Sequence, residues 1–306
     1  MQIYLPIAGI SVNALLLLGM GGLVGFMSGL FGVGGGFLIT PLLIITGISP
    51  AVAVATGANQ VLASSASGVL AHWRRGNVDF KMGGILLVGG LAGSGIGVII
   101  YSWLRGAGQL DIAVGLSYVV MLGGTGVLMG TEALRAMRRR RRAAPPRKLH
   151  QHTWLHGLPL KMRFPRSRLY ISALLPFGIG FGVGLLTAIM GVGGGFIMVP
   201  AMIYLLGMPT TVAIGTSLFQ IIFVSANVTF LQSVGNQTVD VVLALLLLAG
   251  GVIGAQLGSR LSWRLRGEQL RGLLALIVLA VALEIGVELV TTPHDIYSVS
   301  GPEATE

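Results

Sequence analysis

Long apolar runs separated by short polar connections dominate the chain. A helix needs about 20 apolar residues to cross a bilayer, and eight runs approach that length. These runs lie at residues 12–31, 51–72, 83–104, 110–131, 170–190, 210–232, 240–260 and 270–291. Two shorter runs, 37–48 and 196–207, would form helices of roughly 18 Å, too short to cross about 30 Å of hydrocarbon. The pattern predicts five helical elements in each half of the chain, one of them half-length.

The composition supports a membrane protein. Hydrophobic residues make up 54% of the 306 residues and charged residues 10%, whereas about 25% of a soluble domain is charged. So few charges cannot cover the surface of a soluble fold of this size, which excludes a soluble enzyme. Most of the 48 glycines lie inside or directly beside the apolar runs rather than in polar linkers. We therefore predict an all-α polytopic membrane protein.

The basic residues predict how the chain is inserted. The segment 133–169 has no acidic residue and contains 12 of the 20 lysines and arginines, so the positive-inside rule places it in the cytoplasm. Counting crossings outward from it places both termini outside and gives the two halves opposite orientations. The predicted organisation is a first membrane repeat (1–132), a basic cytoplasmic linker (133–169), a second membrane repeat (170–291) and a short non-cytoplasmic tail (292–306).

The two halves also match in sequence. GVGGGFLITP at 32–41 corresponds to GVGGGFIMVP at 191–200, a difference of 159 in residue number. Further matches follow in order, including Thr56 with Thr216 and Asp79 with Asp240. An odd number of elements per half inverts the second copy, as the charge distribution requires independently. Inverted repeats with interrupted helices form many secondary transporters, whose substrate binds near the midplane between the repeats.

The repeated glycine cluster is the strongest candidate for a binding site. Glycine can adopt φ > 0 and lets backbone N–H groups approach a ligand. The short helix that follows would present its positive dipole end to the break, with Pro41 and Pro200 near its first turn. Two such ends predict a clamp for one anion, whereas the alternative is that the glycines only permit tight packing. The candidate residues are Gly34, Gly35, Gly36, Gly193, Gly194 and Gly195.

Polar side chains inside the apolar spans are a second set of candidates. An unpaired polar group in hydrocarbon costs several kcal/mol, so these side chains must contact protein, water or substrate. They either form hydrogen bonds between helices or donate to an anion in a cavity. The candidate residues are Thr56, Asn59 and Gln60 in the first half and Thr216, Ser217 and Gln220 in the second.

Other residues have narrower interpretations. Glu284 is an acidic residue within the last span, so it is a candidate for proton coupling, although it lies toward the outer end of that span, where solvent can also reach it. Asp79 and Asp240 precede spans and are expected to cap helices. The spaced glycines of the long spans, such as Gly21, Gly25 and Gly29, are expected to permit close helix packing.

Several kinds of chemistry lack the residues they need. There are no cysteines, which excludes disulfides, Cys-ligated metals and thiol catalysis, and the five histidines form no spaced ligand set. GVGGGF lacks the Lys-Ser/Thr of a phosphate-binding loop. We expect no cofactor, no metal, no nucleic-acid partner and no enzymatic activity. An intramembrane enzyme would need a nucleophile–base pair, and the spans offer no such pair. That enzyme and a passive anion channel remain the alternatives.

Two longer motifs resemble a known family. GLFGVGGGFLITP and IMGVGGGFIMVP, followed by P-x4-AT-x3-Q and P-x5-GT-x3-Q, resemble the TauE/SafE sulfite exporter family over residues 12–290. The resemblance implies a multi-pass transporter of the bacterial inner membrane, in contact with lipid. It would export small sulfur-containing anions such as sulfite or organosulfonates, driven by a proton or other ion gradient. A homodimer is compatible with this expectation.

Overall fold

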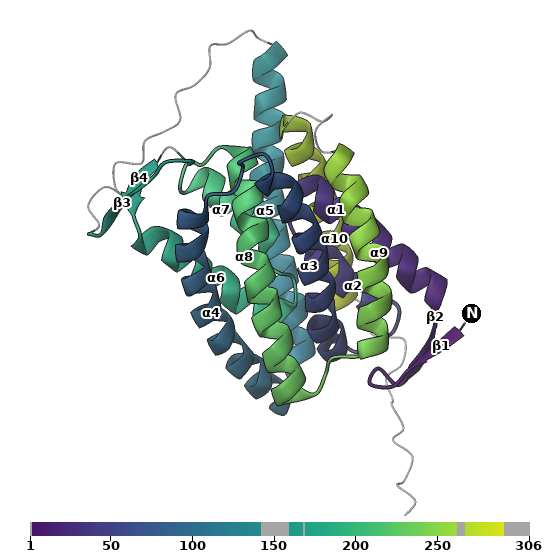
Figure 1. Ribbon diagram of the computed structural model, residues 1–306. Coiled ribbons are helices and arrows are strands. Elements are labelled where there is room, and N and C mark those ends of the chain that lie inside the picture. Colours follow the sequence, from purple (N-terminus) through teal and green to yellow (C-terminus); the bar gives the residue numbers. More distant parts are fainter. Residues whose placement is uncertain (1, 142–158, 168, 262–266, 291–306) are drawn as a thin grey trace, which may run out of the picture.

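The computed structural model describes residues 2–141, 159–167, 169–261 and 267–290, which form a helical bundle with two small hairpins (Figure 1). The first half contains β1 (Gln2–Leu5), β2 (Ile10–Asn13), α1 (Ala14–Phe31), α2 (Gly36–Ile45), α3 (Pro50–Trp73), α4 (Phe80–Gly106) and α5 (Leu110–Arg141). The second half contains β3 (Lys161–Phe164), β4 (Leu169–Ser172), α6 (Leu174–Met190), α7 (Gly195–Tyr204), α8 (Thr210–Leu231), the π-helical turn η2 (Gln232–Asn236), α9 (Val241–Leu261) and α10 (Gly267–Val290).

This architecture confirms the predicted all-α polytopic class. Within the described residues, α1, α4, α5, α8 together with η2, and α9 are long and apolar enough to cross a membrane. α3 has 24 residues but carries several buried polar side chains, and α6 has only 17 residues. The short helices α2 and α7 have 10 residues each. Each of the ten α-helices of the described chain overlaps one of the ten apolar runs.

The helices of the two halves interleave. α1 packs along α9 and α4 packs along α6, while α3 and α8 pack on each other at the centre of the bundle (Figure 1). A Cβ placed on Gly25 would collide with the backbone of Gly251, and one placed on Gly93 would collide with the backbone of Phe181. These contacts confirm the packing role predicted for the spaced glycines, because only glycine lets two backbones approach so closely.

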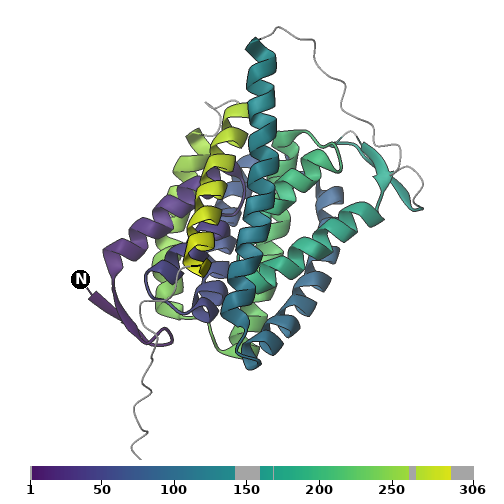
Figure 2. The same cartoon turned by 180° about the vertical axis from the view of Figure 1, so that it is seen from behind.

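Two antiparallel β-hairpins precede α1 and α6 and were not predicted. β1 pairs with β2 and β3 with β4, and the hairpins lie at opposite ends of the bundle (Figure 2). Residues 2–13 and 161–172 differ by the same 159 residues as the glycine motifs, so the repeat extends into the hairpins. The predicted spans at 12–31 and 170–190 therefore begin too early. The predicted linker 133–169 contains the last turns of α5 at one end and β3 at the other.

The two predicted aspartate caps are confirmed. Asp79 Oδ1 accepts a hydrogen bond from the Met82 N–H at 3.1 Å, and Asp240 Oδ1 accepts one from the Leu243 N–H at 3.1 Å. Each carboxylate therefore binds an N–H group at the start of α4 or α9 that has no partner within the helix.

The second oxygen of each aspartate holds a hairpin turn. Asp79 Oδ2 accepts hydrogen bonds from the Ser167 N–H at 3.1 Å and from the Ser167 hydroxyl at 2.6 Å. Asp240 Oδ2 accepts hydrogen bonds from the N–H groups of Ile7 and Ala8, at 2.9 Å and 3.3 Å. The same device thus fixes one hairpin at each end of the molecule.

Candidate functional site

The glycine clusters interrupt the chain with the same backbone conformation in both copies. Gly32 caps the C-terminus of α1 and Gly191 caps that of α6, each in the left-handed region. Two further left-handed glycines follow in each copy, and the short helix then begins. This conformation favours glycine because a Cβ would clash with the backbone. The values of φ are 69° at Gly32, 84° at Gly34, 79° at Gly35, 70° at Gly191, 71° at Gly193 and 69° at Gly194.

The two breaks contact each other directly. A Cβ placed on Gly36, the first residue of α2, would collide with the backbone of Val192. One placed on Gly195, the first residue of α7, would collide with the backbone of Val33. Both valines are buried. The starts of α2 and α7 therefore meet main chain to main chain in the interior of the bundle.

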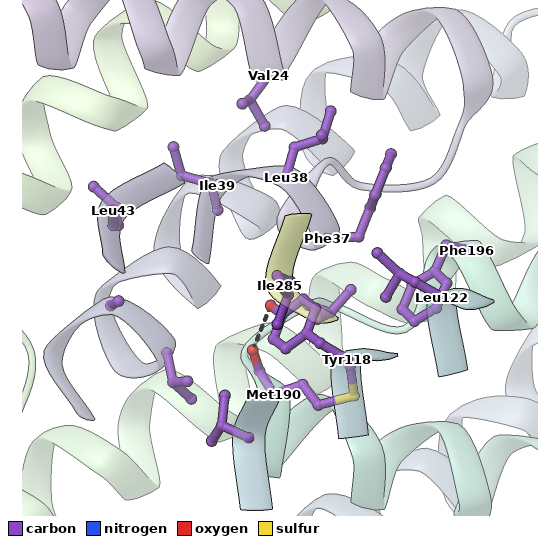
Figure 3. Packing of buried hydrophobic residues seen from close by; sticks show 14 of the residues in the cluster. Val24, Phe37, Leu38, Ile39, Leu43, Tyr118, Leu122, Met190, Phe196 and Ile285 are labelled. Atoms are coloured by element: carbon purple, nitrogen blue, oxygen red, sulfur yellow. Dashed lines mark hydrogen bonds between the residues drawn. The ribbon is translucent and has the colours of Figure 1, made fainter. Parts of the chain in front are cut away.

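Aromatic and aliphatic side chains pack around this meeting point. The rings of Phe37 on α2 and Phe196 on α7 lie with their centroids 6.0 Å apart and are tilted by 39°. Figure 3 shows both rings in one cluster with Tyr118 and Leu122 of α5 and Ile285 of α10. The outer helices α5 and α10 thus pack against the short helices.

The prolines lie deeper in the short helices than predicted. Pro41 and Pro200 are inside α2 and α7, which begin at Gly36 and Gly195, so each proline is the sixth helical residue rather than part of the first turn. A proline at this position has no N–H for the carbonyl four residues earlier. Because each helix begins one residue before the predicted run, at the last glycine of the cluster, the proline falls in the second turn instead of near the first.

The two matching threonines of the repeat bind the main chain of the opposite half. Thr216 Oγ1 accepts a hydrogen bond from the Asp79 N–H at 3.0 Å, and Thr56 Oγ1 accepts one from the Asp240 N–H at 3.0 Å. Both hydroxyls are buried. They hold the starts of α4 and α9 against the central helices, which is the structural alternative that the sequence left open.

The paired glutamines are buried without partners. Gln60 and Gln220 are fully buried, and neither amide group has a hydrogen-bond partner. Gln60 lies beside Gly251 of α9, and Gln220 lies beside Gly90 of α4. A buried polar group without a partner costs roughly 1–3 kcal/mol. The four amide atoms without a hydrogen-bond partner therefore lie at matching positions of the two halves.

The remaining predicted polar residues differ in their surroundings. Ser217 Oγ donates to the Ile214 carbonyl at 2.8 Å and to the Gly32 carbonyl at 3.3 Å, so it links α8 to the first break. Asn59 is half-buried and its Nδ2 has no partner. Glu284 is exposed, whereas the next residue, Ile285, is buried. The carboxylate of Glu284 therefore points away from the buried breaks.

The structure adds two side chains that the sequence analysis missed. Ser64 Oγ donates to the Gly34 carbonyl at 3.0 Å, and the Tyr118 hydroxyl donates to the Met190 carbonyl at 2.9 Å (Figure 3). A tyrosine within an apolar span is a usable signal, because a buried hydroxyl needs a partner. Ser64 follows Gln60 by four residues, so the two side chains share one face of the helix. This spacing could have identified Ser64 from the sequence.

A model of one family, described as "Sulfite exporter TauE/SafE", matches residues 17–285. The chain belongs to the TauE/SafE family. A "Probable membrane transporter protein" of Xylella fastidiosa (strain 9a5c) is 33% identical over 88% of this chain and 93% of its own length. The "Probable membrane transporter protein YjnA" of Bacillus subtilis (strain 168) is 31% identical over 87% of this chain and 97% of its own length.

A local match and a negative result complete these comparisons. "Sulfite exporter TauE/SafE family protein 1" of Arabidopsis thaliana is 47% identical over 60 residues, which are 20% of this chain and 13% of that protein. No solved structure matches. The TauE/SafE match contains both glycine breaks and the central helices α3 and α8. The chain is therefore a multi-pass membrane transporter of this family, and the paired breaks lie within the part that the family shares.

Proposed function

We propose that this TauE/SafE protein is a secondary transporter that exports small sulfur-containing anions such as sulfite or organosulfonates. The anion would bind at the starts of α2 and α7, where the two glycine breaks meet. The single observation that carries the proposal is this meeting of two left-handed glycine breaks, each followed by a short helix, in the buried centre of the bundle.

The start of a helix suits an anion for two reasons. The first N–H groups have no acceptor within the helix, and the helix dipole adds a partial positive charge of about half a unit. The low dielectric of a buried centre strengthens both effects. Among the residues whose burial is described, no lysine or arginine is buried, so the proposed site relies on neutral donors.

The proposed transport cycle requires the two breaks to separate. In the present conformation Val33 and Val192 fill the space in front of the opposite helix start, so an anion has no room there. Separation of α2 from α7 would expose their first N–H groups. The unpaired amides of Gln60 and Gln220, which lie beside Gly251 and Gly90, are further candidate donors. Inverted repeats that rock against each other provide such a movement.

Flux measurements in proteoliposomes test the proposal. The purified protein is assayed with sulfite, methanesulfonate, sulfate and acetate, with and without a pH gradient. We expect saturable flux of sulfite or methanesulfonate that responds to the gradient and shows counterflow. Flux that neither saturates nor shows counterflow would identify a passive channel, and absence of flux for every anion would refute transport of this class.

A further inference from the structure

Two adjacent serines on α3 differ in their hydrogen bonds. Ser64 and Ser65 are both fully buried. The Ser64 hydroxyl donates to the Gly34 carbonyl at 3.0 Å and to the Val61 carbonyl at 3.1 Å, whereas the Ser65 hydroxyl has no partner. A Cβ placed on Gly34 would lie 3.3 Å from Ser65 Oγ. The Ser65 hydroxyl therefore lies beside the first break without a hydrogen-bond partner.

The same face of α3 is directed at both breaks. A Cβ on Gly34 would lie 3.1 Å from Val61 Cγ1 and 3.5 Å from Ile221 Cγ2. One on Gly193 would collide with Val61 and lie 3.2 Å from Ile221 Cγ2. Val61 and Ser65 are four residues apart and so share one helix face. This face lies where the two breaks and the two central helices come together.

The second repeat has the corresponding pair on α8. Ile221 and Ser225 follow Gln220 at the same spacings at which Val61 and Ser65 follow Gln60. Ser225 is also fully buried, and its hydroxyl also has no hydrogen-bond partner. An unpaired buried hydroxyl is destabilising relative to an alanine of similar shape. Its presence at both matching positions points to a partner that is bound in another state.

We propose that the hydroxyl of Ser65 binds the transported anion at the first glycine break, that Ser225 is its counterpart in the second repeat, and that Val61 and Ile221 separate the two breaks in this conformation. This inference rests on the proposed function and adds two residues to the site. A hydroxyl and main-chain N–H groups each donate one hydrogen bond. The arrangement therefore suits an oxyanion with several acceptor oxygens, such as sulfite or a sulfonate.

The first test compares Ser65→Ala with its neighbour Ser64→Ala. Because the Ser65 hydroxyl has no partner in this conformation, its removal should leave the melting temperature in detergent unchanged or raise it. Loss of a hydrogen bond to an anion should raise the KM for sulfite flux by roughly tenfold or more. Ser64→Ala removes the bond to Gly34 and should lower the melting temperature. An unchanged KM in Ser65→Ala would overturn the inference.

A second test needs no flux measurement. The chain has no cysteine, so Ser65→Cys introduces a single thiol of nearly the same size. We expect N-ethylmaleimide to label it and methanesulfonate to slow the labelling at least severalfold. A cysteine at the exposed residue Ser233 serves as the control and should react at the same rate with and without the anion. A thiol at residue 65 that is inert in all conditions, or that methanesulfonate does not protect, contradicts the inference.

The two tests separate the inference from the proposed function. Protection of Ser65→Cys in a protein that transports none of the anions would retain the binding site and refute transport. Sulfite flux in the wild type with neither protection nor a change in KM would retain transport and refute the role of Ser65.

Discussion

The two glycine breaks share a backbone conformation but are anchored by different side chains. At the first break, Ser64 of α3 donates to the Gly34 carbonyl and Ser217 of α8 donates to the Gly32 carbonyl. The positions that correspond to these serines in the other repeat are Val224 and Gly57, which have no hydroxyl. At the second break, Tyr118 of α5 donates to the Met190 carbonyl instead.

The two repeats therefore share the main-chain geometry of the break but differ in the side chains that donate hydrogen bonds to it. The first break is tied to both central helices, whereas the second is tied to an outer helix that packs against α10. The predictions below test how far the two breaks are equivalent.

The largest effect is expected where the breaks touch. A valine at Gly36 or Gly195 would collide with the backbone of the opposite break. Rotation of a side chain cannot relieve a collision with main-chain atoms. We expect each variant to lose about 4 kcal/mol or more of unfolding free energy and all anion flux. Gly84→Val on α4, where a Cβ would meet nothing within 4 Å, is the control, and thermal unfolding in detergent is the measurement. Equal stability of Gly36→Val and Gly84→Val would contradict the packed arrangement.

Alanine substitutions at the left-handed glycines should destabilise the two breaks to different extents. Gly34→Ala and Gly193→Ala both incur the left-handed strain of roughly 1–2 kcal/mol. The new Cβ would lie 3.1 Å from Val61 Cγ1 at Gly34 but would collide with it at Gly193. We therefore expect Gly193→Ala to lose about 1–3 kcal/mol more unfolding free energy than Gly34→Ala and to have the lower melting temperature. Val61→Ala in the Gly193→Ala background should restore part of the loss, and failure to do so would argue against this contact.

Removal of the tyrosine hydroxyl tests the support of the second break alone. Tyr118→Phe leaves the buried Met190 carbonyl without its side-chain donor, which should cost about 1–3 kcal/mol and alter flux through the second break. Tyr170→Phe on β4 is the matched control, because Tyr170 is exposed. Stability of the two variants is compared by thermal unfolding. If Tyr118→Phe behaves like Tyr170→Phe, the second break does not depend on α5.

The smallest effect is expected at Glu284. Its exposure on α10 favours contact with the surroundings of the bundle over a role at the buried breaks. Glu284→Gln should change the unfolding free energy by less than about 0.5 kcal/mol and leave the response of flux to a pH gradient intact. Loss of that response, with flux itself retained, would instead identify Glu284 as the coupling residue.

The sequence by itself determined the number and order of the helices and the positions of the two breaks. These follow from local properties, because the length of an apolar run sets the length of a helix and a glycine cluster permits left-handed backbone. The aspartate caps at Asp79 and Asp240 were also local, since a cap lies at the start of its own helix. The hairpins could have been found from the same repeat, through the matched prolines Pro6 and Pro165.

Only the tertiary structure decided which side chains meet the breaks. Successive residues on a helix point about 100° apart, so the different roles of Ser64 and Ser65 depend on how α3 is rotated against Gly34. The pairing of α1 with α9 and of α4 with α6 was likewise beyond the sequence, because glycine ridges in lipid show that helices approach closely but do not specify the partner. Contacts between distant segments, rather than local pattern, give these residues their chemistry.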